Sequence, residues 1–203
     1  MSSASEEVQI LVENSDSVST DQEDTELHED GRSNDKVRKA NIKTKEVPSS
    51  IDESELLNVS YMYNIPSEYN LVHPSKYMRA DEALDSESLM LYAEDFRSRV
   101  RLPLSESLIS FCNEYHLTIS QMHPNSLRIM CELTKLACQD GTQLTTRAIH
   151  ALYMLQDRGR EDFYFLQART NYNVLHKRGM ISSSKRWKHK FFIVKHKGGF
   201  GKS

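Results

Sequence analysis

The strongest chemical signal in the sequence is a run of cations and aromatic rings near its carboxyl end. Lys185, Arg186, Trp187 and Lys188 are consecutive, and Lys190 follows. Cations neutralise phosphates and flat rings stack on unpaired bases, which is the combination that single-stranded nucleic acid binding requires. In the alternative interpretation, Trp187 packs in the core and the lysines flank a strand and prevent edge pairing. These five residues therefore predict either a contact with RNA or DNA or a purely structural segment.

Cysteine and histidine residues suggest a second kind of chemistry, which is metal binding. Cys112 and His116 are one helical turn apart, and Cys131 and Cys138 follow. Zinc sites, however, usually take a closely spaced pair of ligands from each half of the site, and no second pair is present. The three cysteines also fall on apolar stripes, so we expect reduced, buried thiols that pack as small apolar groups. No metal or other cofactor is predicted.

Two further motifs look like parts of catalytic or nucleotide-binding sites but lack essential residues. Gly201, Lys202 and Ser203 match the end of a phosphate-binding loop, but His196 stands where the first glycine of that motif is required. The serines at 182–184 lack the G-x-S-x-G context of a catalytic nucleophile. The sequence gives no candidate catalytic residue, and we expect that the protein is not an enzyme.

The net charge of −3 conceals an uneven distribution along the chain. Residues 1–50 carry 6 basic and 12 acidic side chains, residues 51–156 carry 8 and 14, and residues 157–203 carry 12 and 3. This layout favours either self-association of acidic and basic regions or an anionic partner at the basic end. No stretch approaches the roughly 18 apolar residues of a membrane span, and no signal peptide is recognisable. We expect an intracellular protein, nuclear or cytoplasmic, with no membrane partner and no small-molecule substrate.

Three amphipathic patterns predict the helices of the core. The first follows the N-cap Ser105 and reaches Tyr115, and the second runs from Pro124 to a stop at Gly141. The third is capped by Thr145 or Thr146 and ends near residue 159. The second is apolar around more than half of its circumference, so we expect it to be the central, most buried helix. A shorter helix is predicted over residues 50–63, with Asp52 or Ser54 as its cap. Leu56, Leu57 and Tyr61 recur there at helical spacing.

Aromatic and β-branched residues predict two strands, Phe163–Ala168 and Phe191–Val194, which we expect to pair antiparallel. The predicted fold class is mainly α with a small antiparallel β element (α+β): a three-helix core plus a C-terminal strand pair.

Composition divides the chain into four parts. Residues 1–50 are predicted to be a disordered tail, first acidic and then basic, because they contain too little apolar surface to offset the ordering entropy. Residues 51–100 are expected to form short helices and a linker that pack on the core. Residues 101–195 form the helical core with its strands, and residues 196–203 form a flexible basic tail.

The order of several short motifs is more specific than any one of them. They are Leu102-Pro103-Leu104, Tyr115-His116-Leu117, Gln121 to Asn125, Phe163-Tyr164-Phe165, and Ser183 to Lys188 before the strand at Phe191. This series resembles the gypsy-type transposon domain of plants over about residues 54–195. The resemblance implies a plant protein descended from a Gypsy-class retroelement of the kind found near gag-like coding regions, truncated at its carboxyl end, with no established activity. The family often has a glycine just before the Leu-Pro-Leu motif, where this chain has Arg99, Val100 and Arg101.

The leading hypothesis is a retrotransposon-derived, non-enzymatic domain that acts in protein assembly or weak nucleic-acid contact through the basic C-terminal segment. The alternative is a degenerate transposon fragment with no present biochemical role. A third hypothesis, a cryptic hydrolase or nuclease, would need clustered inward carboxylates, which the apolar stripes do not contain. The position of Trp187 discriminates between the roles of the basic segment, because an exposed ring favours binding and an enclosed ring favours a structural role.

Overall fold

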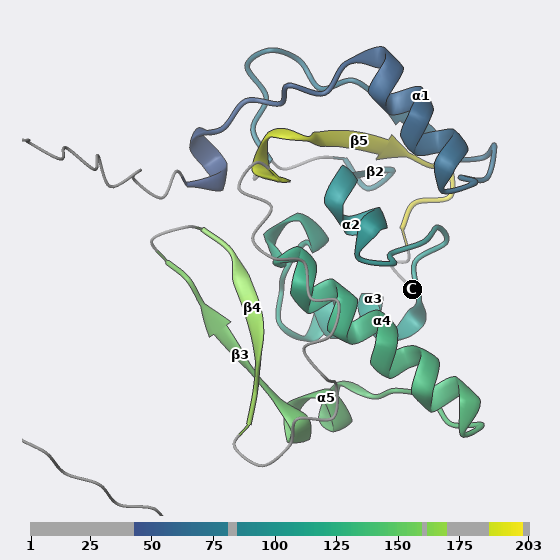
Figure 1. The fold of residues 1–203 in the computed structure, drawn as a ribbon, viewed down its shortest axis with the longest axis vertical. Helices are drawn as coiled ribbons and strands as arrows, with labels where there is room; N and C mark the ends of the chain where they lie inside the picture. Colours follow the sequence, from purple (N-terminus) through teal and green to yellow (C-terminus); the bar gives the residue numbers. More distant parts are fainter. Residues whose placement is uncertain (1–42, 81–84, 160–161, 170–186, 201–203) are drawn as a thin grey trace, which may run out of the picture. The chain divides into compact units, whose positions relative to one another are not determined.

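Two antiparallel sheets organise the part of the chain that the structure describes, which is residues 43–80, 85–159, 162–169 and 187–200 (Figure 1). In this computed structural model, the described residues all belong to one contact unit. Most of the predicted tail, residues 1–42, and the last three residues lie outside the described residues.

The first sheet has the strand order β1 (Asn70–Val72), β5 (Phe191–Lys195), β2 (Ser88–Tyr92). The central strand β5 is antiparallel to both neighbours, with Val194 opposite Leu71 of β1 and Leu89 of β2. Strands from the beginning and the end of the described chain are therefore joined by backbone hydrogen bonds.

Side chains of β5 are buried on both faces of this sheet. Phe192 and Val194 contribute to a large apolar cluster with the helices, whereas Phe191 and Ile193 contribute to a smaller cluster with Trp187 on the other face. Successive side chains of a strand point to opposite faces. Four consecutive apolar residues are therefore the pattern of a strand covered on both sides, as in a central strand.

The second sheet is a hairpin of β3 (Tyr153–Asp157) and β4 (Tyr164–Ala168), with Leu155 opposite Leu166. The predicted pairing of the two aromatic strands is wrong, because β4 pairs with β3 and β5 lies in the other sheet. The predicted third helix is also too long, since α5 (Thr146–Leu152) ends where β3 begins.

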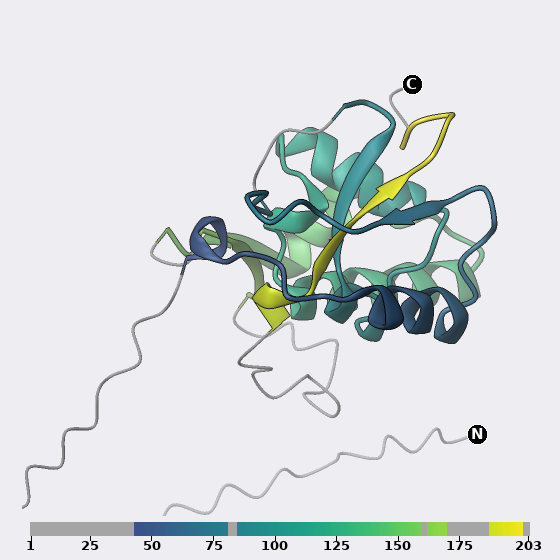
Figure 2. The same ribbon diagram turned by 90° about the horizontal axis from the view of Figure 1, so that it is seen from above.

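Five α-helices surround these strands in the described part of the chain. In addition to α5 they are α1 (Glu53–Met62), α2 (Ala93–Arg97), α3 (Glu106–Glu114) and α4 (Pro124–Gln139). Single turns of 3-10 helix occupy Thr44–Glu46, Ile119–Gln121 and Trp187–His189. Helix α1 contacts β1, and α4 contacts α2, α3 and β4; Figure 2 shows α1 beside the strands of the first sheet.

Local sequence explains where the two predicted helices α1 and α4 begin and end. The Asp52 carboxylate accepts the Glu55 backbone N–H at 2.8 Å, and the Glu55 carboxylate accepts the Asp52 N–H at 3.0 Å, which is a reciprocal capping box. Pro124 occupies the first turn of α4, where its missing N–H would have no helical partner. Gly141 follows the end of α4 with a φ of +66°, a conformation that glycine adopts without strain.

The predicted three-helix core is wrong, because the described fold also requires both sheets. The buried residues of helix α4 lie between Pro124 and Leu133. Leu136 is 41% exposed, so α4 is not buried along its whole length. The residues from Phe191 to Val194 of β5 are buried without interruption. The fold is α+β, with its first sheet lying between two apolar clusters.

The backbone after α2 adopts a conformation that usually requires glycine. Arg99 has a φ of +75°, and the N–H of Val100 donates to the carbonyl of Asp95 at 3.1 Å, which reverses the chain before Leu102. Left-handed backbone after a helix is most often occupied by glycine. Arg99 therefore holds a backbone conformation that is strained for a residue with a side chain.

Candidate functional site

The basic aromatic segment is only partly described, because Lys185 and Arg186 lie outside the described residues. Trp187 is 8% exposed and belongs to the smaller apolar cluster. Its ring meets those of Tyr92 and Phe163 edge to face, with centroids 4.7 and 5.9 Å away. The ring is enclosed by protein, although not by the helix residues of the larger cluster. Most of its surface is used in packing, and its remaining exposed part lines the groove between α1 and α2.

The two described lysines of the segment also contact the rest of the fold. Lys188 Nζ lies 5.0 Å from the centroid of the Phe163 ring, which is a cation–π distance. Lys190 Nζ lies 2.7 Å from a carboxylate oxygen of Glu55 and donates to the backbone carbonyl of Ser50 at 2.9 Å. These contacts join the residues just before β5 to α1 and to Phe163, which precedes β4. The arrangement favours the structural interpretation, and the nucleic-acid site stays a prediction.

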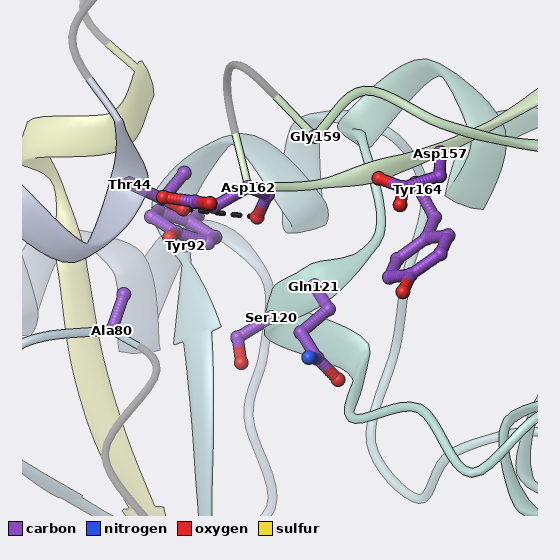
Figure 3. Close-up of a pocket in the computed structure, with 9 residues that line it drawn as sticks. All are labelled: Thr44, Ala80, Tyr92, Ser120, Gln121, Asp157, Gly159, Asp162 and Tyr164. Carbon is purple, nitrogen blue, oxygen red and sulfur yellow. Dashed lines mark hydrogen bonds between the residues drawn. The ribbon is translucent and has the colours of Figure 1, made fainter.

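A polar cavity of about 250 Å³ lies beside the β3–β4 hairpin (Figure 3). Thr44 Oγ1 donates to the carbonyl oxygen of Asp162 at 3.0 Å across its rim. Ser120, the serine that lines it, shares a 3.0 Å hydrogen bond with the hydroxyl of Thr118. No histidine, lysine or cysteine is among the described residues that line this cavity, so they pair no nucleophile with a strong base.

A second groove, of about 400 Å³, lies between α1 and α2. Its apolar wall includes Val59, Met62 and Tyr63, and its polar rim includes Glu55 and Arg97. A groove of this composition is suited to apolar side chains that approach along α1, with charged groups at the edge to orient them.

Helix α1 exposes three large apolar side chains, of which Met62 also lines the groove. Leu57, Tyr61 and Met62 are 71%, 89% and 71% exposed, whereas Leu56 and Val59 of the same helix are buried. Helix residues four apart lie on one face, so Leu57 and Tyr61 form an exposed stripe that is separate from the buried one. Met62 lies about 100° around the helix from Tyr61, on the side of the groove. We call the exposed surface formed by Leu57, Tyr61 and Met62 the α1 face.

Sequence reasoning found α1 but assigned its apolar residues to one side. The spacings from Leu57 to Tyr61 and from Leu56 to Val59 are both helical, so spacing alone does not show which stripe is buried. The exposed stripe rather than the basic segment is therefore the least explained surface feature among the described residues.

The three cysteines differ in their burial. Burial raises the pKa of the Cys112 thiol to about 12 and that of Cys131 to about 11, so both thiols stay protonated and inert. Cys131 is half-buried and Cys138 is exposed, so the expectation that all three thiols are buried is correct only for Cys112. The described histidine, cysteine and acidic residues contain no cluster of three that could hold a metal ion.

One carboxyl group is buried without full hydrogen bonding. Asp95 is 0% exposed; its Oδ2 accepts the backbone N–H of Tyr92 at 2.8 Å, whereas Oδ1 has no partner among the described residues. Burial raises the pKa of Asp95 well above its ordinary value, and the nearby Glu94 raises it further. Because this carboxyl caps α2 from inside the core, it is a structural group with an electrostatic cost.

None of the described helices is long and apolar enough to cross a membrane. Comparisons with protein-family models, with curated proteins and with solved structures found no match for this chain. A proposal about its function therefore depends on its own residues and on the resemblance described above.

Proposed function

We propose that the chain is a non-enzymatic, retroelement-derived domain whose copies associate through the α1 face. The observation that carries this proposal is the exposure of three large apolar side chains on one ten-residue helix. Contiguous apolar surface on a soluble protein marks interaction sites, because its burial releases ordered water and is favourable. Association would cover these side chains.

The groove between α1 and α2 supports the same proposal. It lies beside Met62, so a side chain from a second copy has an apolar recess to enter. Interfaces are strongest where an anchor fills such a recess and excludes water. One short helix covers less than the roughly 800 Å² per partner of a standard interface, so we expect a weak dissociation constant of about 10–100 μM.

The proposed retroelement origin rests on the resemblance carried by the motifs between Leu102 and Phe191. The chain departs from that family in having Arg99, Val100 and Arg101 where the family often has a glycine. A gag-associated ancestor would also be compatible with a role in assembly.

Replacing Leu57 and Tyr61 by glutamine should weaken self-association at least about tenfold, because it removes the apolar groups that association would bury. Light scattering of the full chain from about 5 to 300 μM measures the change in mean mass. Leu136→Gln is the matched control, since Leu136 is an exposed apolar residue on α4. A wild-type chain that remains monomeric throughout this range would disprove the proposal.

Contact with single-stranded nucleic acid is a second candidate, favoured by the 12 basic and 3 acidic side chains of residues 157–203. If about four phosphates are neutralised, the logarithm of the affinity should fall with that of the salt concentration with a slope near −3. Affinity for single-stranded RNA should then drop roughly 60-fold between 50 and 200 mM salt. An absence of binding at the lower salt concentration would exclude this candidate.

A further inference from the structure

We infer that two copies associate about a two-fold axis with their α1 helices antiparallel, and that Glu53 of each copy faces Arg97 of the other. This inference rests on the proposed function, since it specifies the geometry of the association through the α1 face. It is carried by the distribution of charge around α1.

The amino-terminal end of α1 is acidic. Asp52, Glu53 and Glu55 lie within its cap and first turn, and the pKa of Asp52 is lowered by hydrogen bonds from Ser54 and Glu55. Lys190 offsets one of these charges through its contact with Glu55. Glu53 is exposed and forms no ion pair among the described residues. This end therefore carries excess negative charge on its solvent side.

The carboxyl-terminal end of α1 is bordered by cations. Arg101 stacks on the Tyr63 ring at 5.0 Å from its centroid, and Arg97 lines the groove together with Met62 and Tyr63. Arg97 contacts Glu94 at 3.3 Å, yet its side chain remains 67% exposed while that of Glu94 is almost fully covered. The guanidinium is thus the charge that an approaching surface would meet.

This layout selects the relative direction of two helices. A ten-residue helix is about 15 Å long, so its two ends are separated by more than a screening length at physiological salt. In an antiparallel pair, each acidic end faces the basic end of the other copy, whereas a parallel pair would place like charges together. The apolar stripe of Leu57 and Tyr61 lies between the ends and remains in contact in the antiparallel pair.

An antiparallel contact of this kind is self-complementary and closes after two chains. It uses the same face on both copies, so neither copy has an unused α1 face for a third. The expected product is a dimer rather than a filament.

Charge reversal tests the inference. Glu53→Lys and Arg97→Glu should each weaken the homodimer about 5-fold to 10-fold at low salt, because each converts two attractive contacts into two repulsive ones. An equimolar mixture of the two variants should form a heterodimer about as stable as the wild-type dimer. In that mixture both contacts join opposite charges again, since the introduced lysine faces the introduced glutamate.

Matched controls separate this effect from damage to the fold. Glu106→Lys changes the first residue of α3, as Glu53→Lys does in α1, and Arg147→Glu changes an exposed arginine of α5. Neither should alter the dissociation constant by more than about twofold, and circular dichroism should report native folds for all variants. In 0.5 M salt the reversed variants should approach the wild type, because exposed charges are screened.

The outcomes distinguish the geometry from the proposed function. The antiparallel geometry would be overturned if neither charge reversal changed the dissociation constant of the homodimer. It would also be overturned if the mixture of the two variants did not recover the wild-type dissociation constant. Self-association itself would remain in both cases. A mean mass greater than that of two chains would overturn the closed dimer, while self-association itself remained. A monomer at every concentration would overturn both.

Discussion

Replacing Trp187 by alanine is expected to lower the free energy of unfolding by about 3–5 kcal/mol. The ring is 8% exposed and packs against Tyr92, Phe163 and His123, so its removal leaves a large cavity in the smaller apolar cluster. Urea denaturation followed by far-ultraviolet circular dichroism measures the loss, since the variant contains no tryptophan to report by fluorescence.

Tyr77→Ala provides the control for this substitution. Tyr77 is also a large aromatic residue, but it is 80% exposed, so its loss should change stability by less than about 0.5 kcal/mol. A similarly small change for Trp187→Ala would contradict the enclosed position of the ring and would favour its availability for stacking on bases.

Replacing Asp95 by asparagine is expected to stabilise the protein by about 1–3 kcal/mol at pH 8. Asparagine can still accept the Tyr92 N–H, but it removes a charge that would otherwise be buried. The raised pKa means that the folded protein holds this proton over a pH range in which the unfolded chain has released it. Wild-type stability should therefore fall as pH rises from near 4 through the folded-state pKa.

The pH dependence of unfolding tests this explanation. Subtracting the curve of Asp95→Asn from that of the wild type between pH 4 and 9 should give a contribution that becomes more destabilising with rising pH. Asp140→Asn, at an exposed position after α4, should leave the wild-type slope unchanged. A loss of stability at every pH would indicate that Asp95 is needed for its shape or hydrogen bond rather than being penalised for its charge.

Elements with strong local signals could be predicted from the sequence. The cap at Asp52, the proline at 124 and the glycine at 141 each fix a helix end through backbone chemistry that involves only nearby residues. Helices α1 and α4 therefore begin and end close to the predicted positions.

Elements whose structure depends on distant partners were missed. Tyr153 and Leu155 fit both a helical and an alternating pattern over so few residues, and only pairing with β4 makes this segment a strand. The three residues of β1 carry no pattern of their own and become a strand by pairing with β5. The aromatic run at Phe191 identified a strand, but nothing local indicated that its partners lie about a hundred residues earlier.

The candidate site shows the same division. The cluster of Lys188 and Lys190 with Trp187 was visible as composition, but its contacts with Phe163 and Glu55 depend on tertiary structure. The α1 face was not found, because an exposed apolar stripe and a buried one look alike in a short helix. Burial, which only the assembled fold decides, distinguishes them.

The central place of β5 has a consequence for how the protein is made. Every other described strand leaves the ribosome before it, yet β1 and β2 touch no strand in their sheet except β5. Until residues 191–195 emerge from the exit tunnel, both flanking strands keep unpaired edges and Leu91 and Tyr92 lack their neighbours. The first sheet must therefore be completed after nearly the whole described chain has been synthesised, and nascent chains would benefit from chaperones that shield such edges.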